Sequence, residues 1–172
     1  MGTIEIRKTS ITELATDAIV NAANDGLWAG SGVCGAIFDA AGYDKLHAAC
    51  QKIGHCDTGS AVITPGFELK ANYIIHAVGP AWNGGNCGEA NLLYGAYRRS
   101  LDLAVENNCA SIGFPLISSG VFGYPLDQAW RVALKACRDF LDEGKQINIV
   151  FAVLSDRVLS MGKSALKEVS KR

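Results

Sequence analysis

The sequence predicts an α/β sandwich built on a mixed or mostly parallel sheet. Two observations lead to this class. Six short apolar and β-branched runs, each too short for a helix, alternate with longer segments of helical character. The short runs are almost continuously apolar, which is typical of strands covered on both faces. A chain in which strands and helices alternate packs its helices against a central sheet.

The expected strands are bounded by glycine, proline or polar residues, which commonly end extended segments. The first lies near the amino terminus, and the second leads into a glycine-rich stretch. In chain order, the expected strands cover residues 4–7, 18–22, 61–64, 73–78, 111–115 and 147–154.

Two of the expected helices show a clear apolar face. The segment 89–107 aligns Leu93, Tyr97 and Leu101, and the segment 127–141 is followed by Gly144, a residue that commonly stops a helix. In chain order, the expected helices cover residues 33–41, 43–53, 89–107, 127–141 and 159–171.

Length and composition indicate a single domain covering residues 1–172. A chain of 172 residues suits one domain, and its 49% hydrophobic content is enough for a sizeable core. Sixteen Lys and Arg against 17 Asp and Glu give a net charge of −1. This balance offers no general attraction to nucleic acid or to anionic membranes. An anionic ligand would therefore have to be held by local geometry.

The sequence carries no targeting signal. No apolar run approaches the roughly 18 residues of a membrane-spanning helix, and the first residues lack a hydrophobic signal region. The six cysteines are scattered without a C-x-x-C pair and are interpreted as reduced thiols. We therefore expect a cytoplasmic monomer that has no nucleic-acid or membrane partner and no cofactor.

The stretch IVNAANDGLWAGSGVCGAIFDAAG, residues 19–42, carries the first functional signal. Here the expected strand 18–22 is followed closely by Asn24, and a loop with Gly26, Gly30 and Gly32 leads into the next helix. Ligands of open α/β sheets bind where a strand leads through such a loop into a helix. Glycines let backbone N–H groups approach an anion, and a helix N-terminus adds a favourable dipole. The loop has no Lys or Arg, so it would bind phosphate by its backbone alone.

A second stretch, PLISSGVFGYP at residues 115–125, has the same character. Ser118, Ser119, Gly120 and Gly123 could supply N–H and hydroxyl donors. Two such loops facing one crevice would clamp a diphosphate from both sides. One glycine loop alone is more commonly an ordinary turn, so the prediction depends on the pair.

Several motifs together resemble macrodomains, most closely the MacroD-type branch. They are DAIVNAAN, GVCGAIFDAAG, IIHAVGPAW, EANLLYGAYRRSLDLA and FPLISSGVFGYP, in the family's order and spacing, and the resemblance runs from about Ser10 to Leu154. It implies a three-layer α/β/α sandwich that binds ADP-ribose, with ADP-ribose or an ADP-ribosylated protein as partner. Many macrodomains remove mono-ADP-ribose from modified proteins, and some deacetylate O-acetyl-ADP-ribose.

The resemblance also implies a role for each matching residue. Asn24 would hydrogen-bond the hydroxyls of the distal ribose and is the predicted catalytic residue. Asn21 would brace the loop, and Ile11 would line the adenine pocket. Backbone donors to the diphosphate and distal ribose would come from Gly30, Ser31, Gly32 and Val33. The opposite wall would consist of Ser118, Ser119, Gly120, Val121 and Phe122.

Three departures from the family pattern touch the expected site. Ser10 replaces the Asp that accepts the adenine amino group, so a charge-assisted contact is lost. Cys34 and Phe38 replace the Asp and His of the motif V-D-G-A-I-H, whose Asp is usually assigned to the hydrolytic water. Leu154 and Ser155 stand where the family often has an aromatic residue followed by Asp, which weakens stacking on adenine.

Three interpretations stay open. The first is a hydrolase that works without the Asp, similar to viral macrodomains, with water held by the substrate phosphate and Asn24. The second is a non-catalytic ADP-ribose reader, and the third is a macrodomain with altered nucleotide specificity. We favour the hydrolase because the ribose and diphosphate motifs are the intact ones.

Two isolated residues have a functional and a structural interpretation. Cys34 could be a nucleophile, but the sequence shows no activating group besides a helix N-terminus, so a small apolar filler is favoured. His76 sits in an apolar run and is interpreted as a hydrogen-bonded core histidine.

A cluster of possible metal ligands lies in residues 47–56. Its spacing does not match common zinc sites, and the signature loop of zinc-binding macrodomains is absent. We therefore expect no metal at its four members, which are His47, Cys50, His55 and Cys56.

Overall fold

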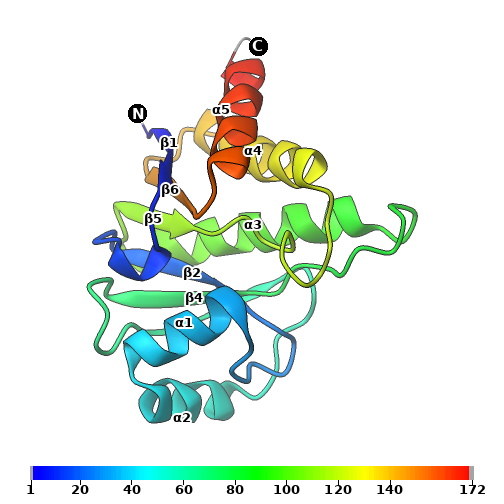
Figure 1. The fold of residues 1–172 in the computed structure, drawn as a ribbon. Helices are drawn as coiled ribbons and strands as arrows, with labels where there is room; N and C mark the ends of the chain where they lie inside the picture. The colour runs from blue at the N-terminus through cyan, green and yellow to red at the C-terminus, as the bar shows by residue number, and fades with distance from the viewer. Residues whose placement is uncertain (1, 171–172) are drawn as a thin grey trace.

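One six-stranded sheet forms the centre of the structure, a computed structural model that describes residues 2–170 (Figure 1). The strand order is β1-β6-β5-β2-β4-β3. Strand β3 runs antiparallel to β4, and the other neighbouring strands are parallel. The strands are β1 (Ile4–Lys8), β2 (Ala18–Ala22), β3 (Ala61–Pro65), β4 (Tyr73–Ala77), β5 (Ser111–Phe114) and β6 (Asn148–Val153).

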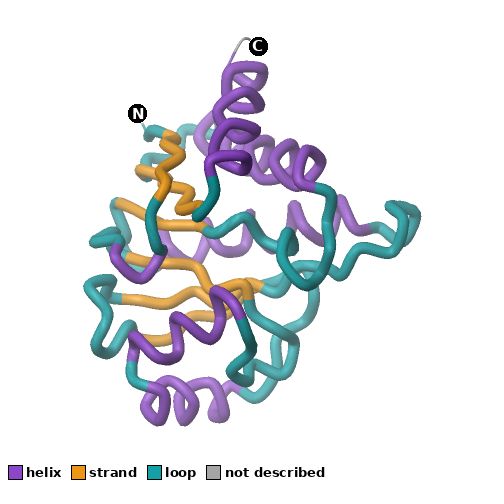
Figure 2. Tube along the Cα trace, in the orientation of Figure 1, coloured by secondary structure: helices purple, strands orange, loops and turns teal. Residues whose placement is uncertain are grey.

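Helices cover both faces of this sheet, as Figures 1 and 2 show. One face is covered by α1 and α2, and the other by α3, α4 and α5, and a separate cluster of buried hydrophobic side chains lies under each group. The predicted three-layer α/β/α sandwich with a mixed, mostly parallel sheet is confirmed. The helices are α1 (Gly32–Ala41), α2 (Tyr43–Ile53), α3 (Glu89–Glu106), α4 (Leu126–Asp142) and α5 (Asp156–Ser170).

Successive strand residues alternate between the two hydrophobic clusters. In β2, Ala18 and Val20 belong to the cluster under α3 and α4, whereas Ile19 belongs to the cluster under α1 and α2. In β4, Ile75 belongs to the cluster under α3 and α4, and Ile74 belongs to the cluster under α1 and α2. Strand side chains point to opposite faces with a period of two. Both faces are therefore buried, which explains why the strands read as continuous apolar runs.

An aromatic cluster holds β5 and β6 against the helices of one face. The ring centroids of Phe114 and Phe151 lie 5.4 Å apart, and Trp130 of α4 lies 5.2 Å from Phe151. The indole N–H of Trp130 donates to the carbonyl oxygen of Val158 in α5 at 3.1 Å. This packing fixes the ends of two strands and the start of α5 relative to one another.

The sequence predicted every strand and helix of this sheet and its covering layers, but several boundaries differ. Helix α5 begins at Asp156, three residues before the expected start, because the hydroxyl of Ser155 accepts the N–H of Val158 at 3.2 Å and caps the first turn. Its expected last residue, Lys171, lies outside the described residues.

The remaining differences are small. Strand β5 stops at Phe114, before a proline that has no N–H for the ladder. A short 3-10 helix at Ile11–Glu13 was not predicted. Between residues 2 and 170, no helix combines the length and the apolar character that crossing a membrane requires.

Candidate functional site

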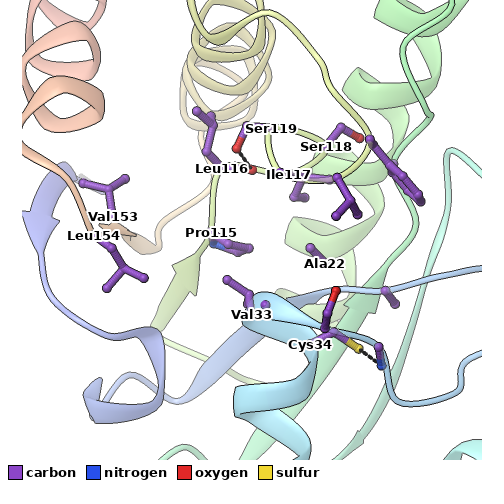
Figure 3. A pocket seen from close by; sticks show the side chains of 18 of the residues that line it. Ala22, Val33, Cys34, Pro115, Leu116, Ile117, Ser118, Ser119, Val153 and Leu154 are labelled. Atoms are coloured by element: carbon purple, nitrogen blue, oxygen red, sulfur yellow. Dashed lines mark hydrogen bonds between the residues drawn. The ribbon is translucent and has the colours of Figure 1, made fainter.

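A cavity of about 520 Å³ lies at the edge of the sheet where β2, β5 and β6 end (Figure 3). Its walls come from Gly79 and from residues within 22–34, 115–122 and 152–158, which are the ends of these strands and the segments that follow them. The three strands are parallel, so their carboxyl ends meet at the same edge. The volume falls within the range of about 300–1,000 Å³ that is typical of small-molecule sites.

Most of the residues predicted to bind a ligand line this cavity. They come from both glycine-bearing loops and from the segment after β6. The predicted residues on the wall are Asn24, Gly30, Ser31, Gly32, Val33, Cys34, Ser118, Ser119, Gly120, Val121, Phe122 and Leu154.

Sequence reasoning missed a further group of wall residues. Apart from Gly79, they are aliphatic or proline residues at or just after strand ends or, for Val158, in the first turn of α5. Such residues give no functional signal of their own. The missed wall residues are Ala22, Ala23, Gly79, Pro115, Leu116, Ile117, Ala152, Val153 and Val158. Ser155, one of the departures from the family pattern, also lines the wall.

Three predicted residues do not line the cavity. The hydroxyl of Ser10 forms a 2.9 Å hydrogen bond with that of Thr12, and Ile11 is buried in the hydrophobic cluster under α1. Their predicted contacts with adenine stay predictions. Asn21 is also buried, and its Nδ2 contacts Cys34 and His76. Its predicted role in bracing the loop stays a prediction.

Asn24 shapes the loop between β2 and α1. Its Nδ2 donates to the carbonyl oxygen of Trp28 at 2.9 Å, and its Oδ1 accepts the Trp28 N–H at 3.1 Å. Leu27, inside this loop, has a φ of +59°, which is uncommon outside glycine. An amide carries two N–H protons and two acceptor lone pairs, so Asn24 keeps one of each for a ligand.

Cys34 is the residue of α1 that ties the loop to the helix. Its Sγ accepts the N–H of Gly30 at 3.4 Å and lies 3.8 Å from the carbonyl oxygen of Trp28. Nδ2 of Asn21 donates to the same sulfur at 3.6 Å. Cys34 is 6% exposed and borders the cavity. Its contacts are those of a residue that holds a loop, and none of them is with a base.

A buried hydrogen-bond chain continues from Asn21 behind the wall. Nδ2 of Asn21 lies 3.1 Å from Nδ1 of His76, and Nε2 of His76 lies 3.0 Å from the hydroxyl of Thr64. These partners assign the neutral tautomer that carries its proton on Nε2. Burial lowers the pKa of His76 to about 4. His76 is therefore a hydrogen-bonded core histidine, as predicted.

The loop between β5 and α4 holds Ser118 in a conformation usual for glycine, with a φ of +68°. Its hydroxyl is buried, lines the cavity and has no hydrogen-bond partner among the described residues. A left-handed non-glycine residue and an unpaired buried hydroxyl each raise the free energy by about 1–3 kcal/mol, and strained residues cluster at functional sites. A Cβ on Gly79 would collide with this hydroxyl and with a methyl group of Ile117, so a larger residue there would displace the Ser118 side chain.

A second loop, residues 82–88, supports the wall at Phe122. The N–H of Trp82 donates to the carbonyl oxygen of Phe122 at 2.8 Å, and the Trp82 ring packs 4.8 Å from that of Tyr124. Glu89, the first residue of α3, anchors this loop through the N–H groups of Asn83, Gly85 and Cys87 at 2.7–3.0 Å. Sequence reasoning missed Glu89 because its partners lie in an irregular loop.

The hydrogen bonds to Glu89 also fix its charge. The Asn83 N–H, followed by those of Gly85 and Cys87, lowers the pKa of the carboxyl from 4.5 to about 2. The anion is therefore the form that the loop requires.

Charge is absent from the described wall. Of the side chains that line the cavity, none belongs to Asp, Glu, His, Lys or Arg. An anion in the cavity would be neutralised by backbone N–H groups and by the N-terminus of α1, which begins at Gly32.

The possible zinc ligands do not come together. Within residues 2–170, no group of three or more His, Cys, Asp or Glu side chains could hold a metal ion. His55 instead contacts Asp57 at 2.8 Å, and Cys50 lies 3.9 Å from His76 in the interior.

The fold and the cavity together define a ligand-binding α/β sandwich whose site is lined by backbone and small side chains. The family described as Macro domain matches residues 20–133, and the chain belongs to this family. A macro domain-containing protein of Chlorobaculum tepidum is 50% identical over 160 residues, covering 92% of each chain. An O-acetyl-ADP-ribose deacetylase of Salmonella typhimurium is 51% identical over 142 residues, covering 80% of this chain and 79% of the relative.

Solved structures agree with this membership. A variant of the Oceanobacillus iheyensis macrodomain with ADPR is 39% identical, with a TM-score of 0.95 over 99% of this chain and 95% of that one. A Trypanosoma brucei macrodomain in complex with ADP is 37% identical, with a TM-score of 0.89 over 95% of this chain and 66% of that one.

Proposed function

We propose that the chain binds ADP-ribose in the cavity and hydrolyses mono-ADP-ribosyl groups on proteins, or O-acetyl-ADP-ribose. The observation that carries this proposal is the pair of glycine-bearing loops, residues 24–33 and 118–123, on the wall of one uncharged cavity. Relatives described as an O-acetyl-ADP-ribose deacetylase and as macrodomains with ADPR or ADP support it.

The diphosphate lies between the two loops. Gly32 has a φ of +60° and Ser118 one of +68°, so both turns adopt left-handed conformations of the kind found in backbone anion sites. Helix α1 has ten residues and begins at Gly32, which adds its dipole to the same place. The fixed N–H groups replace the cations that a phosphate site otherwise uses.

The distal ribose lies beside Asn24. The amide's remaining proton and lone pair suit vicinal hydroxyls, each of which both donates and accepts. Phe122 supplies an apolar surface under the sugar ring, and the unpaired hydroxyl of Ser118 supplies a further donor.

Catalysis is substrate-assisted. A water held by Asn24 and a phosphate oxygen attacks the anomeric carbon of a mono-ADP-ribosyl group, and the bond to the acceptor side chain breaks. For O-acetyl-ADP-ribose, the water attacks the acetyl carbonyl, and the ester C–O bond breaks to give acetate and ADP-ribose. In both cases the water proton passes to the phosphate oxygen and then to the leaving oxygen.

A non-catalytic ADP-ribose reader is the second candidate. One observation favours it: Cys34 is the one titratable side chain on the described wall, and its thiol is occupied by the loop. A reader would bind the same ligand with the same residues and release nothing from a modified protein.

The setting of this function is part of the proposal. We place it in one domain over residues 1–172 that acts as a cytoplasmic monomer on ADP-ribose or ADP-ribosylated protein. The net charge of −1 supports partners other than nucleic acid or anionic membranes.

Two experiments test the proposal. Calorimetry should show tighter binding of ADP-ribose than of ADP or AMP, because the distal ribose adds contacts. Equal affinity for the three ligands, or no heat with any, would contradict the assignment. Release of ADP-ribose from a mono-ADP-ribosylated protein, or of acetate from O-acetyl-ADP-ribose, separates the hydrolase from the reader.

A further inference from the structure

The two ends of the cavity differ in chemistry. Figure 3 shows Val153 and Leu154 on one side of Pro115, and Ser118 and Cys34 on the other. The second end holds the unpaired hydroxyl and the polar glycine-bearing loops. The first end is built from the close of β6 and the start of α5, and its side chains are largely aliphatic.

Aliphatic surface is left uncovered at the first end. Leu154 is 72% exposed although it borders the cavity, and Val153 and Val158 continue the wall behind it. The carbonyl oxygen of Val153 already accepts the N–H of Thr9 at 3.0 Å. Such a surface binds the face of a flat aromatic ring by contact area, which depends weakly on the polar substituents at the ring's edge.

No described charged side chain reaches the wall at this end. The neighbouring carboxylate, Asp156, does not line the cavity and contacts Nζ of Lys8 at 3.1 Å. The hydroxyl of Ser10 is engaged with Thr12. A charged acceptor that would favour an amino group over a carbonyl group on the ring is therefore missing from the wall.

Ser155 is the one polar side chain at this end of the described wall, and its hydroxyl can act as a hydrogen-bond donor or as an acceptor. Its Oγ accepts the N–H of Val158 at 3.2 Å, which leaves its own proton and a second lone pair. A hydroxyl rotates to donate to a carbonyl or to accept from an amino group. Ser155 can therefore adapt to rings with either pattern.

The geometry points to a base subsite that selects a purine by its bulk and not by its hydrogen-bonding pattern. The inference rests on the proposed function and widens its ligand class to purine nucleoside diphosphate riboses. Adenine, hypoxanthine and guanine forms bind with similar affinity, and pyrimidine forms bind more weakly because they cover less of the aliphatic wall.

Calorimetry with ADP-ribose and inosine diphosphate ribose tests the inference. The two ligands differ only at the base, where the amino group of adenine is replaced by the carbonyl group of hypoxanthine. We expect dissociation constants within about threefold, since a hydrogen bond to a charged acceptor would separate them by about 10- to 100-fold. A preference of tenfold or more for either ligand overturns the inference and leaves the proposed function intact. Failure of both to bind overturns the proposed function itself.

Two variants locate the subsite. Leu154→Ala should weaken both ligands by about the same factor, three- to tenfold. Ser155→Asp keeps a side chain that can cap α5 and adds a carboxylate, so it should create a preference for ADP-ribose of about fivefold or more. Ile53→Ala, at an exposed position of α2, should leave both affinities unchanged. An unchanged ligand ratio in Ser155→Asp would place the base elsewhere and overturn the inference.

Discussion

The side-chain amide of Asn24 closes the β2–α1 loop on the backbone of Trp28. Nδ2 of Asn24 donates to the Trp28 carbonyl at 2.9 Å, and the Trp28 N–H donates back to Oδ1 at 3.1 Å. The sulfur of Cys34 approaches the same carbonyl at 3.8 Å. Asn24 therefore shapes the loop with half of its hydrogen-bonding capacity and can offer the other half to a ligand.

Asn24→Ala should lower the rate of ADP-ribose release by about 100-fold. The change removes a ribose contact and both bonds to Trp28, and a misplacement of about 1 Å can cost on the order of 100-fold in rate. Single-turnover release from a mono-ADP-ribosylated protein measures the effect. Asn91→Ala, exposed on α3, is the matched control and should behave as the unmodified chain does.

Cys34→Ala should keep the rate within about threefold, because the thiol contacts no base that would activate it and the two hydrogen bonds between Asn24 and Trp28 still hold the loop. Cys34→Asp should raise the rate, since a carboxylate there could orient the water. The same release assay measures both variants. Loss of turnover in Cys34→Ala with turnover retained in Asn24→Ala would show that the thiol is chemical and that the proposed mechanism is wrong.

The fold could be predicted from the sequence because strands buried on both faces and amphipathic helices leave strong patterns. The start of α5 was missed because it depends on a hydrogen bond from the Val158 N–H to Ser155, which hydropathy does not record. The sequence pattern also did not predict that β3 runs antiparallel to β4, since an apolar run has the same composition in either strand direction.

The two glycine-bearing loops could be predicted because small residues after a strand are a local signal. The roles of Glu89 and Gly79 could not be predicted. Glu89 acts through an irregular loop, and Gly79 acts through Ser118, which is distant along the chain. The hydrogen bond between the hydroxyl groups of Ser10 and Thr12 could not be predicted from the sequence either.

Glu89→Gln should weaken ADP-ribose binding by about 2- to 30-fold, the range of coupling through a supporting residue. In the glutamine variant, an NH2 group replaces one of the two carboxylate oxygens and faces an N–H of the 82–88 loop. Two donors then oppose each other, which loosens the Trp82–Phe122 contact. Calorimetry measures the affinity. Glu106→Gln, exposed at the other end of α3, is the control, and equal affinities in the two variants would refute the positioning role.

Acid should release the same loop. The pKa of Glu89 is lowered to about 2 in the folded chain from 4.5, so its stabilisation is complete above pH 4.5 and is lost as the pH falls toward 2. Near-ultraviolet circular dichroism of the tryptophans should follow this transition. A Glu89→Gln chain with the same acid transition would show that other carboxyls cause it.

His76 should make the folded state less stable between pH 7 and pH 5. Its pKa is lowered from 6.5 to about 4 by burial, so the unfolded chain binds the proton first, and stability is complete above pH 6.5 and falls as the pH drops toward 4. The loss between pH 7 and 5 should be about 2 kcal/mol. Urea unfolding at pH 7 and pH 5 measures this loss in the free energy of unfolding. His76→Gln should reduce the difference between the two pH values, even if the variant is less stable at both. An equal pH dependence in both chains would mean that His76 does not carry the effect.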